Sequence, residues 1–157
     1  MDRIANRAGV SKATVYTRWR SKDELLVAAY QHLSRPFPTL DTGTLTGDVD
    51  ALCDLVIAGA ADRRYAAVLI ELVAAAATDP SLQPHLHAVS NNWHTGLRAM
   101  LRSTQDRAEL DDDVAVPLLA EVLSALTLRR VMFQNPPIDD TIRTDLHTLV
   151  RNPPRNP

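Results

Sequence analysis

Residues 4–25, IANRAGVSKATVYTRWRSKDEL, constrain the fold of this chain more than any other stretch, because a glycine separates two short helical segments. Gly9 can take the positive φ that a sharp turn requires, and Ala8 is small enough for the two helices to cross closely. Ser11 stands where its hydroxyl can cap the second helix. A small helix, a glycine turn and a capped second helix predict a helix-turn-helix.

A third helix follows this motif and closes the N-terminal unit. Ser21 and Glu24 have the spacing of a capping box, in which a hydroxyl and a carboxylate satisfy free amide donors at the start of a helix. Two prolines then end the helix, and a stretch rich in threonine and glycine follows. We therefore predict an N-terminal unit over residues 1–35 and a linker over residues 36–46.

The rest of the chain has the composition of a helical globular domain. Of the 157 residues, 45% are hydrophobic, 23% are charged and only 4% are aromatic. Alanine and leucine abound, which favours helices over strands. We predict an all-α fold with a C-terminal domain over residues 47–151 and a disordered tail over residues 152–157. With ends uncertain by about 2–4 residues, the expected helices are 47–60, 62–78, 81–103, 114–134 and 138–151.

Charge is distributed unevenly along the chain. The net charge is −2, but residues 1–35 contain seven lysines and arginines against three acidic residues. This part therefore carries +4, which leaves −6 for the remainder. A basic end on an acidic body is expected when one part of a protein docks on phosphate and the other has a different task. The distribution favours a nucleic-acid partner for the N-terminal unit.

The second helix of the motif is the one expected to enter the major groove of DNA. Arginine and lysine suit guanine, the methyl groups of alanine and threonine suit the thymine methyl, and hydroxyls suit phosphate. The outward residues expected to read DNA are Lys12, Ala13, Thr14, Tyr16, Thr17 and Arg18. The alternatives are that Lys12 and Arg18 are ordinary solvated helix charges and that Tyr16 is a core aromatic residue.

The same stretch resembles the signature of the TetR family of repressors. The residues that carry the resemblance are Gly9-Val10-Ser11-Lys12, Tyr16, Trp19, and Ser21-Lys22 followed by Leu25. The resemblance implies that the second helix faces DNA and that Lys22 holds a phosphate. It assigns Val10, Val15 and Trp19 to the core of the unit. Farther along, the stretch from DTGTLTGDVDAL to TDPSL resembles one common C-terminal subfamily.

The sequence departs from the family pattern at its start. Family members carry a further helix, often preceded by a basic arm, that packs across the helix-turn-helix. We expect that the sequence is shortened here, because a degenerate unit would have lost some of its capping and turn residues. The apolar side of Ile4, Val15 and Trp19 is then partly uncovered. The alternative is a helical interaction or ligand-binding module that has lost DNA binding.

The resemblance also implies partners. A member of this family is a homodimer that binds operator DNA and is released from it by a small-molecule effector. The ligand cavity of the family lies among the middle helices of the C-terminal domain, which here are 62–78 and 81–103. The residues expected to line the cavity are Leu69, Leu72, Val73, Trp93, Leu97 and Leu123.

The predicted helix at 114–134 contains PLLAEVLSALTL and is apolar on nearly every side. Such a helix must be covered on more than one face. Either a partner subunit covers it, or it is an interior helix of a monomer. We expect the last two helices to pair with their copies in a four-helix bundle, because the final helix has a matching apolar stripe. The expected interface residues are Leu119, Val122, Leu126, Ile142, Leu146 and Leu149.

Nothing in the sequence indicates an enzyme, a metal site or a cofactor. It contains no phosphate-binding glycine loop and no Gly-x-Ser-x-Gly elbow, and Cys53 lies in an apolar run where an inert thiol is expected. His85, His87 and His94 share a segment without a second cluster of metal-ligand spacing. The acidic run 109–113 is expected to be solvated and to lead into a helix. With no signal sequence or long apolar span, we expect a cytoplasmic protein with no membrane contact.

Overall fold

The computed structural model describes residues 1–133 and 138–156, and these residues form helices and no strands. The helices are α1 (Asp2–Ala8), α2 (Lys12–Arg18), α3 (Lys22–Leu33), α4 (Leu45–Ala61), α5 (Arg63–Ala76), the 3-10 turn η1 (Pro80–Leu82), α6 (Gln83–Asp106), α7 (Val116–Phe133) and α8 (Thr141–Arg151). The all-α prediction is confirmed. The predicted helix end at residue 134 and the last tail residue, 157, lie outside the described residues. No helix in the described part is long and apolar enough to cross a membrane.

Local signals explain the breaks between the first three helices. Gly9 ends α1 in the left-handed conformation with φ 68°, and the Ser11 hydroxyl accepts a hydrogen bond at 3.0 Å from a backbone N–H of α2. The Ser21 hydroxyl caps α3 in the same way. Glu24 accepts from the backbone N–H of Arg20 at 2.5 Å, one residue earlier than a standard capping box requires.

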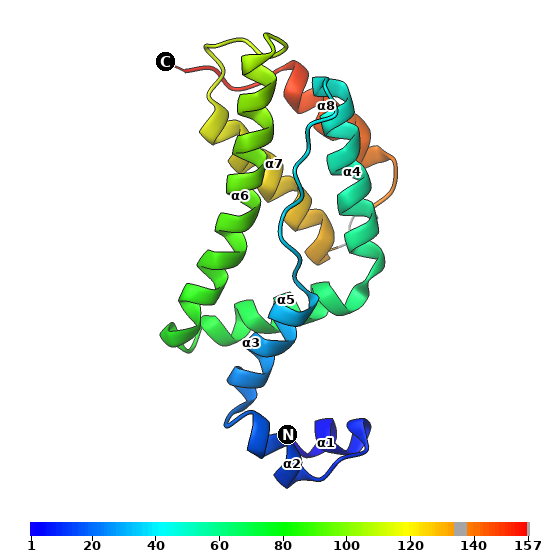
Figure 1. Ribbon diagram of the computed structural model, residues 1–157, viewed down its shortest axis with the longest axis vertical. Helices are drawn as coiled ribbons and strands as arrows, with labels where there is room; N and C mark the ends of the chain where they lie inside the picture. Colours follow the sequence, from blue (N-terminus) through cyan, green and yellow to red (C-terminus); the bar gives the residue numbers. More distant parts are fainter. Residues whose placement is uncertain (134–137, 157) are drawn as a thin grey trace.

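The first two helices form one end of the molecule and reach the rest through α3 (Figure 1). Helix α3 docks on α5, which crosses the base of a body made by α4, α6, α7 and α8. The linker after α3 runs the length of this body before α4 begins and returns toward α5 (Figure 1). The DNA-binding candidate is thus held at one end of a helical body by a single connecting helix.

The body has one apolar core to which α4, α6, α7 and α8 all contribute. Leu119 of α7 and Ile142 and Leu146 of α8 belong to it, each with 0% of its surface exposed. A side chain that is fully buried within its own subunit has no surface left for a partner. The prediction that these three residues lie in a dimer interface is therefore wrong. Helical periodicity identified the apolar stripe but not the surface that the stripe covers.

The buried carboxylate of Asp48 fixes the far end of the linker. Its Oδ1 accepts hydrogen bonds from the backbone N–H of Thr42 at 2.6 Å and from the Thr42 hydroxyl at 2.8 Å. Its Oδ2 lies 2.7 Å from the guanidinium of Arg107, which also pairs with Asp41 and Glu109. Burial by itself would raise the pKa of Asp48, but the hydrogen bonds from Thr42 and Arg107 bring it below its usual value. The carboxylate is ionised at neutral pH.

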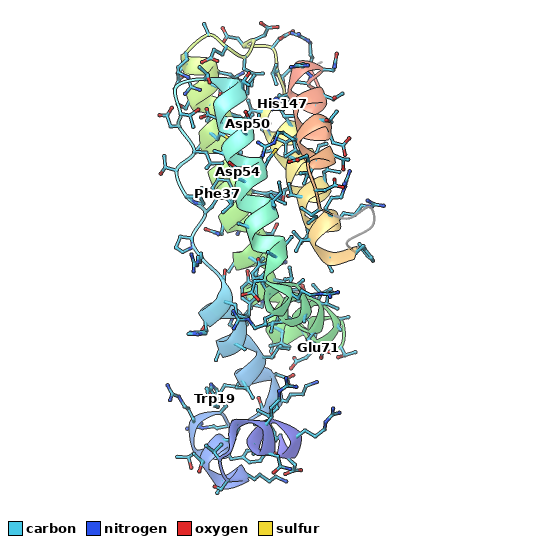
Figure 2. The ribbon with its side chains drawn as sticks, turned by 90° about the vertical axis from the view of Figure 1, so that its right-hand side faces the viewer. Trp19, Phe37, Asp50, Asp54, Glu71 and His147 are labelled. Atoms are coloured by element: carbon cyan, nitrogen blue, oxygen red, sulfur yellow. The ribbon has the colours of Figure 1, made fainter. Side chains whose placement is uncertain are left out.

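Salt bridges along one edge of the core join α4 to α8. Arg143 of α8 pairs with Asp50 at 2.9 Å and with Asp54 at 2.7 Å. His147, one turn later, lies 2.9 Å from the same Asp50 carboxylate (Figure 2). Pairs as exposed as these contribute little stability individually, so the buried apolar residues shared by α4 and α8 hold the two helices together.

The described part of the C-terminal tail is ordered. Arg155 pairs with Asp111 at 2.9 Å and with Asp113, and backbone hydrogen bonds tie residues 152–156 to the loop before α7. The prediction of a disordered tail is therefore wrong for these residues. Glu109 of the acidic run pairs with Arg107, just after α6, and Asp111 and Asp113 pair with the distant Arg155.

Asp48→Asn removes the charge that meets Arg107 but keeps an oxygen that can accept both Thr42 hydrogen bonds. We expect the free energy of unfolding to fall by roughly 1.5–3 kcal/mol at neutral pH, the worth of a hydrogen bond to a charged group. The pKa of Asp48 is lower in the folded state than its ordinary value of 3.8. The stability difference between wild type and variant is therefore fully present at a pH above the ordinary pKa. It shrinks as the pH falls through the lower pKa of the folded state.

Urea unfolding of wild type and variant at neutral and acidic pH measures this effect. Asp54→Asn is the matched control, because the Asp54 carboxylate also meets an arginine but is 72% exposed. We expect little change in that variant. Equal losses in the two variants would contradict the role assigned to Asp48.

Candidate nucleic-acid interface and apolar cavity

The predicted DNA contacts lie together on the surface of α2 and at the start of α3. The exposed residues are Lys12, Ala13, Thr14, Tyr16, Thr17, Arg18 and Lys22. Tyr16 is 43% exposed, so the alternative that it is a core residue is wrong. The opposite side of α2 is held by the buried Val15. The helix therefore presents one continuous polar and basic face to solvent.

Several of these side chains have partners within the chain. Lys12 Nζ lies 2.9 Å from the Asp2 carboxylate, and this hydrogen bond raises the pKa of Lys12, which keeps the lysine charged. Lys22 lies 3.5 Å from Glu71 of α5. The Thr17 hydroxyl donates to a backbone carbonyl one turn earlier at 2.9 Å. Lys12 and Lys22 each have to leave an acidic partner before they can contact another molecule.

Two aromatic rings orient the basic side chains. The guanidinium carbon of Arg18 lies 5.3 Å from the centre of the Trp19 ring, and Lys12 Nζ lies 5.9 Å from that of Tyr16. Such cation–π contacts steady a long side chain without using its N–H donors. Arg18 is thereby held at the end of α2 with its donors available.

The apolar side of the motif is only partly covered. Val15 is buried and Trp19 is half-buried, as their assignment to the core requires. Val10 and Ile4 are exposed, because nothing in the described residues packs over that side. The assignment of Val10 to the core is therefore wrong.

A cavity of about 230 Å³ lies in the body between α5, α6 and α7. Its lining residues are Tyr65, Leu69, Val73, Leu86, Val89, Ser90, Trp93, Ser124, Thr127, Leu128, Val131 and Met132. Among the described residues, no charged side chain contributes to the wall. A concave apolar surface with a few hydroxyls is the usual form of a small-molecule site.

Half of the residues expected at the cavity are there. Leu69, Val73 and Trp93 line it, whereas the other expected residues are fully buried elsewhere. Leu97 and Leu123 belong to the core of the body, and Leu72 lies in the cluster beneath α3. Sequence reasoning found the correct helices but could not assign their faces. The hydroxyl residues that interrupt apolar α7, Ser124 and Thr127, were the signal that it missed.

The cavity wall also holds α3. Tyr30 of α3 is buried against Leu69 and Leu72 of α5. Its ring centre lies 5.9 Å from that of Tyr65, and the two hydroxyls are 3.4 Å apart. Because Tyr65 and Leu69 line the cavity, one wall of the cavity is the reverse side of the cluster that anchors the N-terminal unit.

The linker touches a second cavity residue. The ring of Phe37 meets Trp93 edge-on, with centres 5.1 Å apart, and the Phe37 N–H donates to the Asn92 side chain at 3.2 Å. Figure 2 shows Phe37 on the linker where it runs beside the body. Gly96 makes room for this ring, since a Cβ at that position would stand 2.0 Å from it.

Other reactive groups are not gathered into a site. Within the described residues, no group of three or more histidine, cysteine or acidic side chains could hold a metal ion. Cys53 is fully buried, and its burial raises the pKa of the thiol to about 11. It is therefore an unreactive core residue at neutral pH.

Comparison with known proteins covers nearly the whole chain. Residues 1–29 match the family described as "Bacterial regulatory proteins, tetR family", and residues 39–152 match "Tetracyclin repressor-like, C-terminal domain". Relatives from Mycobacterium tuberculosis and Mycobacterium bovis, described as HTH-type transcriptional regulators, are 30% identical over 147 residues. The match spans 91% of this chain and 71% of each relative.

Solved structures agree in fold. Salmonella enterica GusR superposes with a TM-score of 0.70 at 24% identity, over 94% of this chain and 82% of that one. The TetR family transcription regulator SCO0332 superposes with a TM-score of 0.63 at 25% identity, over 96% and 84% of the two chains.

Gly96→Ala tests the contact between linker and α6. Alanine normally stabilises a helix by about 1 kcal/mol relative to glycine, but here the new methyl group displaces Phe37. We expect the melting temperature to fall and the near-ultraviolet circular dichroism of Trp93 to change. Gly59→Ala in α4 is the matched control, since its Cβ meets nothing within 4 Å, and it should raise the melting temperature. A rise in both variants would show that Phe37 does not lie on Gly96.

Proposed function

This chain belongs to the TetR family of transcriptional regulators and has a DNA-binding N-terminal domain, and on that premise we propose that it is a homodimeric repressor released from operator DNA by a small molecule. One observation carries the proposal. A single chain combines an exposed, capped recognition helix with an apolar cavity whose wall anchors the helix that follows. The alternative of a module without DNA binding is not favoured, because the family match at residues 1–29 includes α2.

In the complex, α2 lies in the major groove. Arg18 and Lys12 approach base edges from its exposed face, and the methyl groups of Ala13 and Thr17 meet thymine methyls. Lys22 leaves Glu71 for a backbone phosphate at the start of α3, where the helix N-terminus adds its own attraction for an anion. Release of Glu71 links DNA binding to the surface of α5.

The dimer forms through the outer side of α7 and α8. Leu118 remains 48% exposed, and Val122, Leu126 and Leu149 keep part of their surface exposed. These residues provide an apolar surface for the partner subunit, which the fully buried Leu119 cannot provide. A two-fold axis through this face brings the two recognition helices to successive major grooves, about 34–36 Å apart.

An effector in the cavity favours a position of α3 that does not fit this spacing. The effector and the operator then weaken each other's binding by the same factor, because coupling between two sites is reciprocal.

Arg18→Ala tests the DNA contact. We expect affinity for a DNA site selected from a random pool to fall by about 1–3 kcal/mol, with loss of preference at one base pair. Fluorescence anisotropy over a range of salt concentrations measures both effects, since phosphate contacts set the salt slope. Arg63→Ala, an exposed arginine of α5, removes the same charge far from α2 and should leave affinity nearly unchanged. Equal affinities for wild type and Arg18→Ala would rule out Arg18 as a DNA contact.

Leu118→Glu tests the dimer face. A charge in the centre of an apolar interface cannot be paired, so we expect the variant to sediment as a monomer. Ile70→Glu on α5 is the matched control, because Ile70 is 42% exposed, and that variant should remain dimeric. A dimeric Leu118→Glu protein would place the interface elsewhere.

A further inference from the structure

We propose that the cavity takes an uncharged, mainly apolar molecule with a hydrogen-bond acceptor, and that Tyr65 binds this acceptor at the expense of its contact with Tyr30. The inference rests on the proposed effector site. It goes further by naming the class of molecule and the residue that senses it.

The composition of the wall decides the charge of the ligand. No charged side chain among the described residues lines the cavity, so a carboxylate or ammonium group there would lose its hydration without gaining an ionic partner. Tyr65 does not supply a charge either, because burial raises its pKa well above its ordinary value. The aliphatic residues of all three helices, among them Leu69, Val89 and Val131, favour an apolar body for the ligand.

The hydroxyl of Tyr65 decides the polar group of the ligand. A phenol carries one proton that it can donate and an oxygen that can accept. Tyr65 lines the cavity, and its hydroxyl lies 3.4 Å from that of Tyr30, where either oxygen can be the donor. In the bound state that we propose, Tyr65 donates its proton to a carbonyl or ether oxygen of the ligand and not to Tyr30.

The present partner of Tyr65 is a weak one. The two tyrosine hydroxyls are 3.4 Å apart, at the long end of a hydrogen bond. Tyr30 keeps another partner when Tyr65 turns away, because the Ser34 hydroxyl donates to it at 3.2 Å. An acceptor at normal distance in the cavity can therefore displace Tyr30 at small cost.

Tyr65 lies where replacing Tyr30 by a ligand can act on α3. The other hydroxyl-bearing residues that line the cavity, Ser90, Ser124 and Thr127, are on α6 and α7, whereas Tyr65 is on α5, which carries α3. Its ring packs on that of Tyr30, so a movement of Tyr65 changes the surface on which α3 packs. Helix α3 in turn joins the helix-turn-helix to the body (Figure 1).

Three fluorescent naphthalenes that share one ring system test the ligand class on the full chain. Prodan is a neutral ketone, dimethylnaphthylamine lacks the ketone, and dimethylaminonaphthoate has a carboxylate in its place. We expect wild-type protein to bind prodan more tightly than either of the other two. Tyr65→Phe should weaken prodan binding roughly threefold to tenfold, as expected for one neutral hydrogen bond. It should leave dimethylnaphthylamine binding unchanged.

Thr78→Ala is the control, because it removes an exposed hydroxyl just beyond the end of α5, outside the residues that line the cavity. It should bind prodan as wild type does. Tyr30→Phe should bind prodan at least as tightly, since it keeps the Tyr65 proton free for the ketone.

Amide hydrogen exchange of α3 tests the second half of the proposal. Saturating prodan should speed exchange in α3 of the wild type and leave it unchanged in Tyr65→Phe. Tyr30→Phe should exchange faster in α3 without any probe. If Tyr65→Phe does not fold, two other measurements still test the proposal. They are the preference of the wild type for prodan and the rate of α3 hydrogen exchange in Tyr30→Phe.

Four results would overturn the proposal: no binding of prodan, tighter binding of the naphthoate, equal prodan affinity in Tyr65→Phe, or α3 exchange that prodan does not change. The proposed function fails by a different result, the absence of specific DNA binding. The two failures can therefore be told apart.

Discussion

The packing of α3 against α5 is the contact on which the rest of this structure depends. Helices α1 and α2 bury little of their own, with Ala5 and Val15 as their buried residues. A unit this small cannot hold its shape by its own core, because the apolar area that it removes from water does not offset the entropy of ordering the chain. Its stability has to come from α3, whose buried residue is Tyr30 and whose apolar side rests on α5. The orientation of the recognition helix is therefore set by the surface of α5.

Helix α5 serves two clusters at once. Leu72 belongs to the cluster beneath α3, Val73 lines the cavity, and Leu69 and Tyr65 take part in both. Under the function proposed above, a ligand in the cavity acts on α3 through these shared residues. On the other side of α5, the Asp48 and Arg107 pair and the salt bridges between α4 and α8 join the elements at the far end of the body.

The N-terminal unit and the body also differ in charge. The basic N-terminal unit meets the acidic body through Lys22 and Glu71, at the junction of α3 and α5. The pair is exposed and weak, so a phosphate can replace the carboxylate. Inside the body the opposite rule applies: the buried carboxylate of Asp48 is fully paired, and the described wall of the cavity carries no charge. Charged groups therefore lie at the surface between the N-terminal unit and α5, and apolar groups line the cavity.

The features that the sequence determined by itself are those that neighbouring residues control. Gly9 breaks α1 because it alone accepts the positive φ of that turn, and Ser11 and Ser21 begin helices because their hydroxyls reach amides three residues on. The family resemblance and the order of the helices follow from such local patterns. Tertiary structure alone decided which side of each apolar helix faces inward. It buried Leu119 and Ile142 in the body, moved Leu72 and Leu97 out of the cavity wall, and paired the acidic loop with Arg155. The reason is physical: a hydrophobic stripe requires burial but does not specify against what, and that choice is made only when distant helices pack together.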